Sequence, residues 1–376
     1  MTVAMTELRG HLLTPAGFLR GQLRVVDGRI AAVDGDPVTE AQVRADTATP
    51  LWLPGFVDLH VHGGGGADAM DGGAAIVTLA RTHARHGTTA LLATTMTAPL
   101  SEVETALQAV RPHCSARSRG GARVLGVHLE GPYISGRRLG AQPDFVRAPA
   151  LAEILALHAI APLRVLTLAP EVEGALALIP ALADAGIRVQ IGHSTASYEL
   201  AAQALAQGAC GFTHLFNAMS GLHHREPGVV GAAFAHGRHA ELIPDLLHVH
   251  PGAIRAALRA LPGLHCVTDA TSATGMPDGD YRLGRQTVTK CLGAVRLADG
   301  TLAGSTLTLD QALRNLVLHL GLPLTQASAH VSTLAARYLG EHERGVIAVG
   351  AHADLVQLQG ATLQVQQVWV EGESIR

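Results

Sequence analysis

One stretch decides the fold of this chain: residues 54–63, which read Pro-Gly-Phe-Val-Asp-Leu-His-Val-His-Gly. Its apolar, β-branched run begins after Pro-Gly and ends at consecutive glycines, which predicts a buried strand followed by a turn. Side chains alternate faces along a strand, so Asp58, His60 and His62 point to the same side. Burying these polar groups costs free energy unless a partner engages them, and imidazole suits divalent metal ions. The stretch therefore predicts a metal site at a strand end.

A His-x-His pair would mean little by itself, because the chain of 376 residues contains 21 histidines. The context gives it weight, since strand-like and alanine-rich helical segments alternate from Gly55 onward. This rhythm predicts a parallel sheet, and its length fits a (β/α)8 barrel of the TIM type, which takes roughly 250 residues. The expected strands are 56–62, 88–94, 122–129, 163–169, 187–191, 209–214, 242–249 and 264–269. The expected helices include 74–86, 100–109, 150–158, 175–185, 198–207, 253–261 and 308–320.

The two ends of the chain follow a different pattern, with short apolar runs separated by turns. Asp27-Gly28 lies between two such runs and predicts a hairpin. Runs at 346–349, 353–358 and 363–370 return to the same pattern. We expect residues 1–54 and 345–376 to form one small β-sandwich domain, and residues 55–344 to form the barrel. Residues 284–300 are expected to form a β-hairpin inserted before the last helix.

Composition excludes several classes of function. The formal net charge of −3 gives no electrostatic reason to bind nucleic acid or an acidic membrane. The four cysteines are far apart and include no Cys-x-x-Cys, which argues against disulfides and thiolate zinc sites. The longest apolar region, 148–170, is interrupted by charges and proline, and residues 1–20 lack a signal-peptide core. We therefore expect a cytoplasmic protein without a membrane partner.

Lysine is almost absent, since Lys290 is the only one in the chain. A Schiff-base mechanism or a Walker A loop would have to use this residue. It lies in Thr-Val-Thr-Lys-Cys, which has no glycine-rich phosphate loop. Neither mechanism is expected.

In a barrel of this type, functional groups lie at the C-terminal ends of the strands. Polar residues with useful chemistry occur at the ends of most expected strands here. They are His60, His62, Glu130, His193, His214, His248 and Asp269. These residues should converge at one mouth of the barrel.

This set of residues suits a site for one or two divalent ions. His60, His62 and Glu130 could hold one ion and Glu130, His193 and His214 a second, with Glu130 as the anion between the two cations. Such sites accept zinc, iron, cobalt or manganese, so the sequence does not specify the metal. A bound ion lowers the pKa of its water and gives a hydroxide nucleophile. Asp269 could then act as general base and acid.

These residues lie in motifs that resemble the amidohydrolase superfamily and, within it, the N-acetylglucosamine-6-phosphate deacetylase family. The resemblance extends over nearly the whole chain. Besides 54–63, it rests on 128–133 (His-Leu-Glu-Gly-Pro-Tyr), 192–194 (Gly-His-Ser), 213–219 (Thr-His-Leu-Phe-Asn-Ala-Met), 225–228 (Arg-Glu-Pro-Gly), 267–270 (Val-Thr-Asp-Ala) and 299–305 (Asp-Gly-Thr-Leu-Ala-Gly-Ser). It implies metal-dependent hydrolysis of a 2-acetamido sugar phosphate to acetate and an amino sugar phosphate, in amino-sugar catabolism or cell-wall recycling.

The resemblance also implies roles for individual residues. Phosphate recognition would fall to Arg225, His248 and the backbone amides of Asn217 and Ala218. Some relatives bridge two metals with a carboxylated lysine on strand 4, which this chain lacks, so Glu130 is the implied bridge. Gln142 stands where many members have a histidine near the reacting carbonyl. Glutamine can donate a hydrogen bond but cannot become charged.

The sequence leaves another substrate and other classes of protein to consider. The substrate could be N-acetylgalactosamine 6-phosphate instead. Residues 62–65 (His-Gly-Gly-Gly) and 192–196 (Gly-His-Ser-Thr-Ala) resemble serine-esterase motifs, but that mechanism leaves Glu130 and His214 unexplained. A non-catalytic protein of this fold is disfavoured because the ligand set is intact.

The long loop at 221–225 and the resemblance predict a homodimer whose partner closes the phosphate end.

Overall fold

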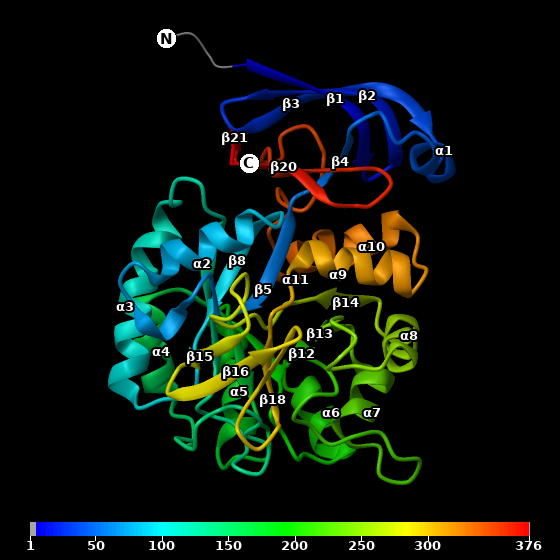
Figure 1. The fold of residues 1–376 in the computed structure, drawn as a ribbon. Coiled ribbons are helices and arrows are strands. Elements are labelled where there is room, and N and C mark those ends of the chain that lie inside the picture. The colour runs from blue at the N-terminus through cyan, green and yellow to red at the C-terminus, as the bar shows by residue number, and fades with distance from the viewer. Residues whose placement is uncertain (1–4, 376) are drawn as a thin grey trace.

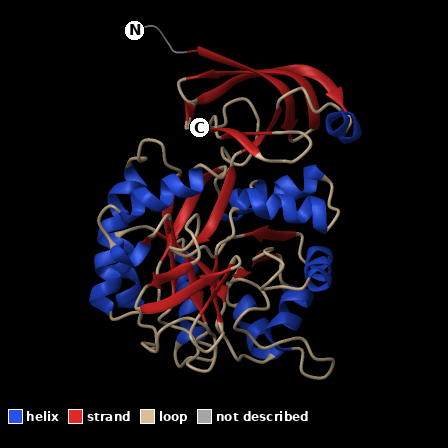
Figure 2. Cartoon of the chain, viewed as in Figure 1, coloured by secondary structure: helices blue, strands red, loops and turns tan. Residues whose placement is uncertain are grey.

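The computed structural model describes residues 5–375 as a barrel with a sheet above it, and strands from both terminal segments lie side by side in that sheet (Figure 1). Helices surround the strands of the barrel on its outside (Figure 2). Among the described residues, no helix has the length and apolar character needed to cross a membrane.

The barrel is built from eight parallel strands in chain order, as predicted. Six of them form one sheet and β13 pairs with β14 in parallel. Backbone hydrogen bonds close the ring: Leu215 donates to the carbonyl of Glu241 at 2.9 Å, and Asp269 donates to that of His60 at 2.9 Å. The strands are β5 (Phe56–Val61), β8 (Thr88–Thr94), β9 (Arg123–Glu130), β10 (Leu163–Leu168), β11 (Arg188–Ile191), β12 (Gly211–Phe212), β13 (His239–Leu242) and β14 (Gly263–Cys266).

Helices follow the strands, and most lie close to the predicted positions. The predicted ones are α2 (Ala75–Ala84), α3 (Leu100–Ser115), α4 (Leu151–Ile160), α5 (Ala175–Asp184), α6 (Tyr198–Ala206), α8 (Pro251–Ala260) and α9 (Leu309–Arg314), which continues as a π-helical turn, η2 (Asn315–His319). Three more α-helices of the barrel were not predicted: α7 (Gly228–His236), α10 (Leu324–Val331) and α11 (Thr333–Leu339). α7 is short and nearly all apolar, so it has no helical alternation to recognise.

The strand predicted at 242–249 was misplaced. The structure ends β13 at Leu242 and continues as a loop through Val249. Pro244 lacks a backbone donor, and the Asp245 carboxylate accepts the backbone N–H groups of Leu247 at 2.9 Å and His248 at 2.8 Å. These bonds fold the apolar run into a turn and place His248 in a loop above the barrel.

The insertion before the last helices is larger than the predicted hairpin. It is an antiparallel sheet of four strands, β15 (Gly279–Leu283), β16 (Gln286–Cys291), β17 (Ala294–Arg296) and β18 (Leu302–Ser305). Met96, after barrel strand β8, joins the small apolar cluster of this sheet. The insertion thereby covers part of the barrel mouth.

The terminal segments form a seven-stranded sheet that folds around its own core. Its order is β21-β20-β19-β4-β1-β2-β3, which mixes both ends of the chain. Leu23 and Ile30 from one end of the sheet pack with Leu355 and Trp369 from the other. The strands are β1 (Met5–Thr14), β2 (Gly17–Val26), β3 (Arg29–Val38), β4 (Leu51–Pro54), β19 (Leu355–Leu358), β20 (Val365–Val370) and β21 (Glu373–Ser374), with α1 (Glu40–Ala45) after β3.

Two details of this sheet bear on the predictions. Asp27 and Gly28 turn between β2 and β3 with φ of 48° and 78°, as a two-residue hairpin requires. Residues 346–349 form no strand, although Val346 and Ile347 pack against the sheet core. The boundaries at 54 and 345 stay a prediction.

A charged network joins the terminal sheet to the barrel. The Arg123 guanidinium on β9 donates to both carboxylate oxygens of Glu371, at 2.8 and 2.7 Å. Arg344 donates to the same carboxylate at 2.5 Å and also to Asp354. Burial raises the pKa of Glu371, but the hydrogen bonds from Arg123 and Arg344 outweigh it and lower the pKa from 4.5 to about 2.

We expect Glu371→Gln to destabilise the protein by roughly 1–3 kcal/mol at neutral pH, because charged hydrogen bonds are lost. A depressed carboxyl pKa stabilises the fold above the unfolded value, and this contribution disappears as the pH falls through the folded value. The difference from wild type should therefore shrink between about pH 5 and pH 2. Urea unfolding at several pH values measures it. Glu343→Gln is the control, because Glu343 pairs with Arg29 at an exposed site. A difference independent of pH would contradict the prediction.

Candidate active site

The barrel mouth brings together six of the seven residues that the sequence analysis placed at strand ends. β5 ends between His60 and His62, and Glu130 ends β9. The other three residues follow β11, β12 and β14. All six residues are at most 8% exposed: His60, His62, Glu130, His193, His214 and Asp269.

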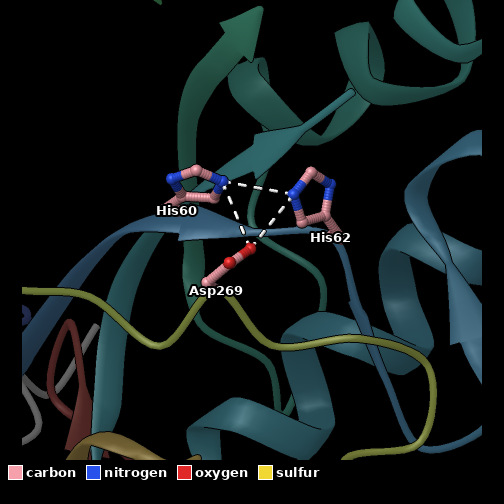
Figure 3. A group of neighbouring side chains, drawn as sticks. All are labelled: His60, His62 and Asp269. Atoms are coloured by element: carbon pink, nitrogen blue, oxygen red, sulfur yellow. Dashed lines mark hydrogen bonds and ion pairs between the residues drawn. The ribbon is translucent and has the colours of Figure 1, made fainter. Parts of the chain in front are cut away.

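His60, His62 and Asp269 form a first group of possible ligands, and their side chains point toward one another (Figure 3). The two imidazole Nε2 atoms are 3.1 Å apart. Asp269 Oδ1 lies 3.4 Å from Nε2 of His60 and 3.2 Å from Nε2 of His62.

Glu130, His193 and His214 form a second group. Glu130 Oε1 lies 3.0 Å from Nε2 of each of these histidines, which are themselves 3.1 Å apart at Nε2. The other carboxylate oxygen, Oε2, lies 3.1 Å from His62 Nε2 and 3.5 Å from His60 Nε2. Glu130 thus stands between the two groups with one oxygen toward each.

The donor set fits divalent ions. His60 Nδ1 lies 2.9 Å from a Glu241 oxygen, and His193 Nδ1 lies 2.7 Å from the Arg138 carbonyl. A proton on each Nδ1 leaves the Nε2 lone pair free to bind a cation. Nε2 lone pairs that face each other at 3.1 Å repel unless a cation or a proton lies between them. The chain therefore has residues suited to hold a divalent metal ion.

Three of these residues adopt backbone conformations that side chains seldom occupy. The φ angles are 47° for His193, 27° for His214 and 51° for Asp269. Such conformations cost free energy and tend to occur at functional sites. Here they occur at the turns directly after the strands, where His193 and His214 enter the second group and Asp269 enters the first.

The histidines and carboxylates of the site favour one another's charged forms. Burial raises the pKa of Glu130, but His60, His193 and His214 hold it well below its usual value. Burial also raises the pKa of Asp269, but His60 and His62 lower it overall, below its usual value. Burial lowers the pKa of His62, but Asp269 and Glu130 raise it to about 9. Both carboxylates are therefore ionised, as cation binding requires.

Asp58 is buried, as predicted for this strand, but it lies outside both groups. It accepts hydrogen bonds from the backbone N–H of Thr268 at 3.2 Å and from its hydroxyl at 2.7 Å. Burial raises the pKa of Asp58 to about 7. Asp58 thereby connects β5 to the segment that leads to Asp269.

A cavity of about 330 Å³ opens above the two groups. Its wall includes four of the predicted substrate-binding residues: Gln142, Asn217, Ala218 and His248. Arg225 is placed elsewhere: it is exposed in the loop after β12, and Nη1 lies 2.8 Å from His224 Nε2. One chain alone does not bring Arg225 to the cavity.

Gln142 contacts Glu130 directly. Its Nε2 donates to Glu130 Oε2 at 2.6 Å, and its Oε1 accepts the backbone N–H of Thr97 at 2.7 Å. These two bonds fix the orientation of the amide. Gln142 therefore holds the oxygen of Glu130 that faces the first group.

The structure also places residues here that the sequence analysis did not single out. Arg137 and Arg138, between β9 and α4, line the cavity. Glu241 and His128 lie behind His60, which they join in a third cluster. Arg137 and Arg138 are visible in the sequence as a basic pair between two glycines. Glu241 lies in the four-residue strand His-Ala-Glu-Leu, which gives no local signal.

The arrangement disfavours the serine-esterase alternative. Ser194 is fully buried, and its hydroxyl donates to Glu171 at 2.7 Å. A nucleophilic serine needs an exposed hydroxyl beside a histidine base. The structure instead directs the neighbouring His193 toward Glu130.

A barrel with histidines and a carboxylate at its strand ends defines a class of hydrolases, and comparison with known proteins agrees. The model of the amidohydrolase family matches residues 51–375, so the chain belongs to that family. The chain is thus a hydrolase that acts on amide bonds with the help of a divalent metal ion.

The names of individual relatives also specify substrates. N-acetylgalactosamine-6-phosphate deacetylase of Escherichia coli O157:H7 is 42% identical over 371 residues, covering 96% of this chain and 97% of its own. N-acetylglucosamine-6-phosphate deacetylase of Vibrio furnissii is 40% identical, covering 93% and 89%. A solved structure is also similar: a mutant N-acetyl-D-glucosamine-6-phosphate deacetylase of Mycobacterium smegmatis in complex with N-acetyl-D-glucosamine-6-phosphate. It has a TM-score of 0.90 and 34% identity and covers 99% of both chains.

Proposed function

We propose that this chain hydrolyses the N-acetyl group of N-acetylglucosamine 6-phosphate and releases acetate and glucosamine 6-phosphate. One observation carries the proposal: Glu130 lies between two groups of possible metal ligands at the floor of a cavity suited to a sugar phosphate. The named relatives support it. We assign His60, His62, Glu130, His193 and His214 as ligands, together with Asp269 on the first ion. One or two ions of zinc, iron, cobalt or manganese would suit these donors.

The residues divide the chemistry between them. When bound, a divalent ion lowers the pKa of water and polarises the amide carbonyl. Asp269, ionised at the cavity floor, accepts the proton of the attacking water and delivers it to the leaving nitrogen. Without this proton the amine would be a poor leaving group. The histidines cannot take over the role while their Nε2 atoms are bound to ions.

The phosphate would bind at the other end of the cavity. His248 is suited to it, because Asp245 lies 2.6 Å from its Nδ1. Burial lowers the pKa of His248, but Asp245 raises it overall, which favours the cationic ring. The backbone amides of Asn217 and Ala218 would donate to the same anion. We propose that Arg225 reaches the phosphate from the partner subunit of a homodimer, because its own chain leaves it in an exposed loop.

N-acetylgalactosamine 6-phosphate is the second candidate substrate. It is favoured by the Escherichia coli relative, whose name contains that sugar. The two sugars differ only in the orientation of one hydroxyl group, so the same ligands and the same general base serve both. We further propose that the enzyme works in the cytoplasm, where sugar phosphates are retained.

Acetate release from four compounds tests the proposal: each acetamido sugar with and without its 6-phosphate. We expect efficient hydrolysis only of the phosphorylated forms, because the cavity would position the amide through the anion. Equal rates with and without phosphate would overturn the assigned phosphate site. No release from any of the four would overturn the function. A monomer with full activity would contradict the homodimer.

A further inference from the structure

Glu241 is a fully buried carboxylate that has no role in the proposed reaction. It lies on β13 and forms a third cluster with His60 and His128. The cavity wall does not include it, so it does not touch a substrate there. A carboxylate buried in this way carries a large desolvation cost, which its partners must offset.

The partners of Glu241 belong to both groups. Its Oε2 atom lies 2.9 Å from Nδ1 of His60, in the first group. The same atom accepts the backbone N–H of His214, in the second group, at 3.3 Å. Its Oε1 atom has no hydrogen-bond partner within residues 5–375. One carboxylate oxygen thus contacts a member of each group.

We infer that Glu241 is a positioning residue that fixes His60 with Nδ1 protonated and Nε2 free to bind a cation. The inference rests on the proposed function in taking His60 and His214 as ligands. A ring whose Nδ1–H is bonded to a carboxylate keeps one tautomer and one orientation, and its Nε2 becomes a better donor. The second contact connects this ring to the backbone of the turn that carries His214. Glu241 therefore contacts both groups, as Glu130 does, but Glu241 lies outside the cavity wall.

Cobalt binding without substrate tests the inference. Full-length protein is treated with a chelator and titrated with Co²⁺, and affinity and visible absorption are recorded for wild type and Glu241→Gln. We expect about 10–100-fold weaker binding, the usual effect of losing such an outer partner, together with a changed absorption band. Asp310→Asn is the matched control, because Asp310 is also a buried carboxylate but pairs with His86 and Arg314 away from the site. It should keep wild-type affinity.

Wild-type affinity and spectrum in Glu241→Gln would overturn the inference. If this variant does not fold, ¹⁵N-histidine NMR of the zinc-loaded wild type decides. A slowly exchanging proton on His60 Nδ1 would support the inference, and a proton on Nε2 would overturn it. A wild type that binds cobalt without deacetylating the substrates would overturn only the proposed function. A wild type that binds no cobalt would overturn both.

Discussion

Asp269→Asn is expected to lower kcat for acetate release by about 10²–10⁴-fold, the usual contribution of a general acid–base group. The asparagine would keep the shape of the side chain and one oxygen toward His60 and His62, but it cannot accept and return a proton. Asp269 lies 3.2 Å from His62 Nε2 at the cavity floor and is ionised there. The chain has no lysine nearby to replace it, since Lys290 donates to backbone carbonyls of Ala273 and Met276.

Steady-state kinetics beside metal analysis checks this prediction. Asp280→Asn is a suitable control, because Asp280 is an exposed carboxylate on β15 that bonds Thr289. The substrate KM should change little compared with kcat, because the lost group acts in the chemical step. Turnover within about tenfold of wild type with unchanged metal content would show that another group moves the proton.

Glu130→Gln is expected to disturb both ion sites and to reduce turnover to background. The Glu130 carboxylate is the anion between the two groups, with Oε1 at 3.0 Å from His193 and His214 and Oε2 at 3.1 Å from His62. A neutral amide cannot offset the repulsion of two cations. Metal affinity should fall by more than the roughly 10–100-fold that an outer partner contributes.

The variant His60→Ala distinguishes the loss of one ligand from the loss of the carboxylate that lies between both groups. That variant should mainly empty the first site, whereas Glu130→Gln should affect both. Glu153→Gln is the carboxylate control, because Glu153 bonds Tyr133 and Arg147 outside the site. Metal analysis of the three variants measures the difference. A second ion that stays fully bound in Glu130→Gln would contradict the bridging role, as would a wild type that never takes up more than one ion.

Most of the barrel could be predicted from the sequence because local patterns and topology agree. Apolar strands alternate with alanine-rich helical segments, and the strand-end rule then places His193 and Asp269 at one mouth although 75 residues separate them. The prediction failed where an apolar run had no such regularity. α7 lacks a polar face, and the run after β13 is turned by Pro244 and Asp245 rather than paired.

The residues that converge at the barrel mouth were easier to predict than the residues that support them. His60 and His62 stand in a short motif whose alternation shows that both face the same way. Glu241 has no such signal, because its contact with His60 joins residues 181 positions apart. The position of Arg225 could not be predicted either, because its motif does not show that the loop keeps Arg225 away from the cavity of the same chain. Contacts of this kind depend on tertiary structure.

Metal-dependent acetate release tests the central claim most directly. Chelator-treated protein is assayed with N-acetylglucosamine 6-phosphate while a divalent ion is added back, and bound ions per chain are counted in the same samples. We predict almost no release from the metal-free protein and a rate that rises with the number of ions bound. Full activity in a sample with no bound ion would contradict the claim.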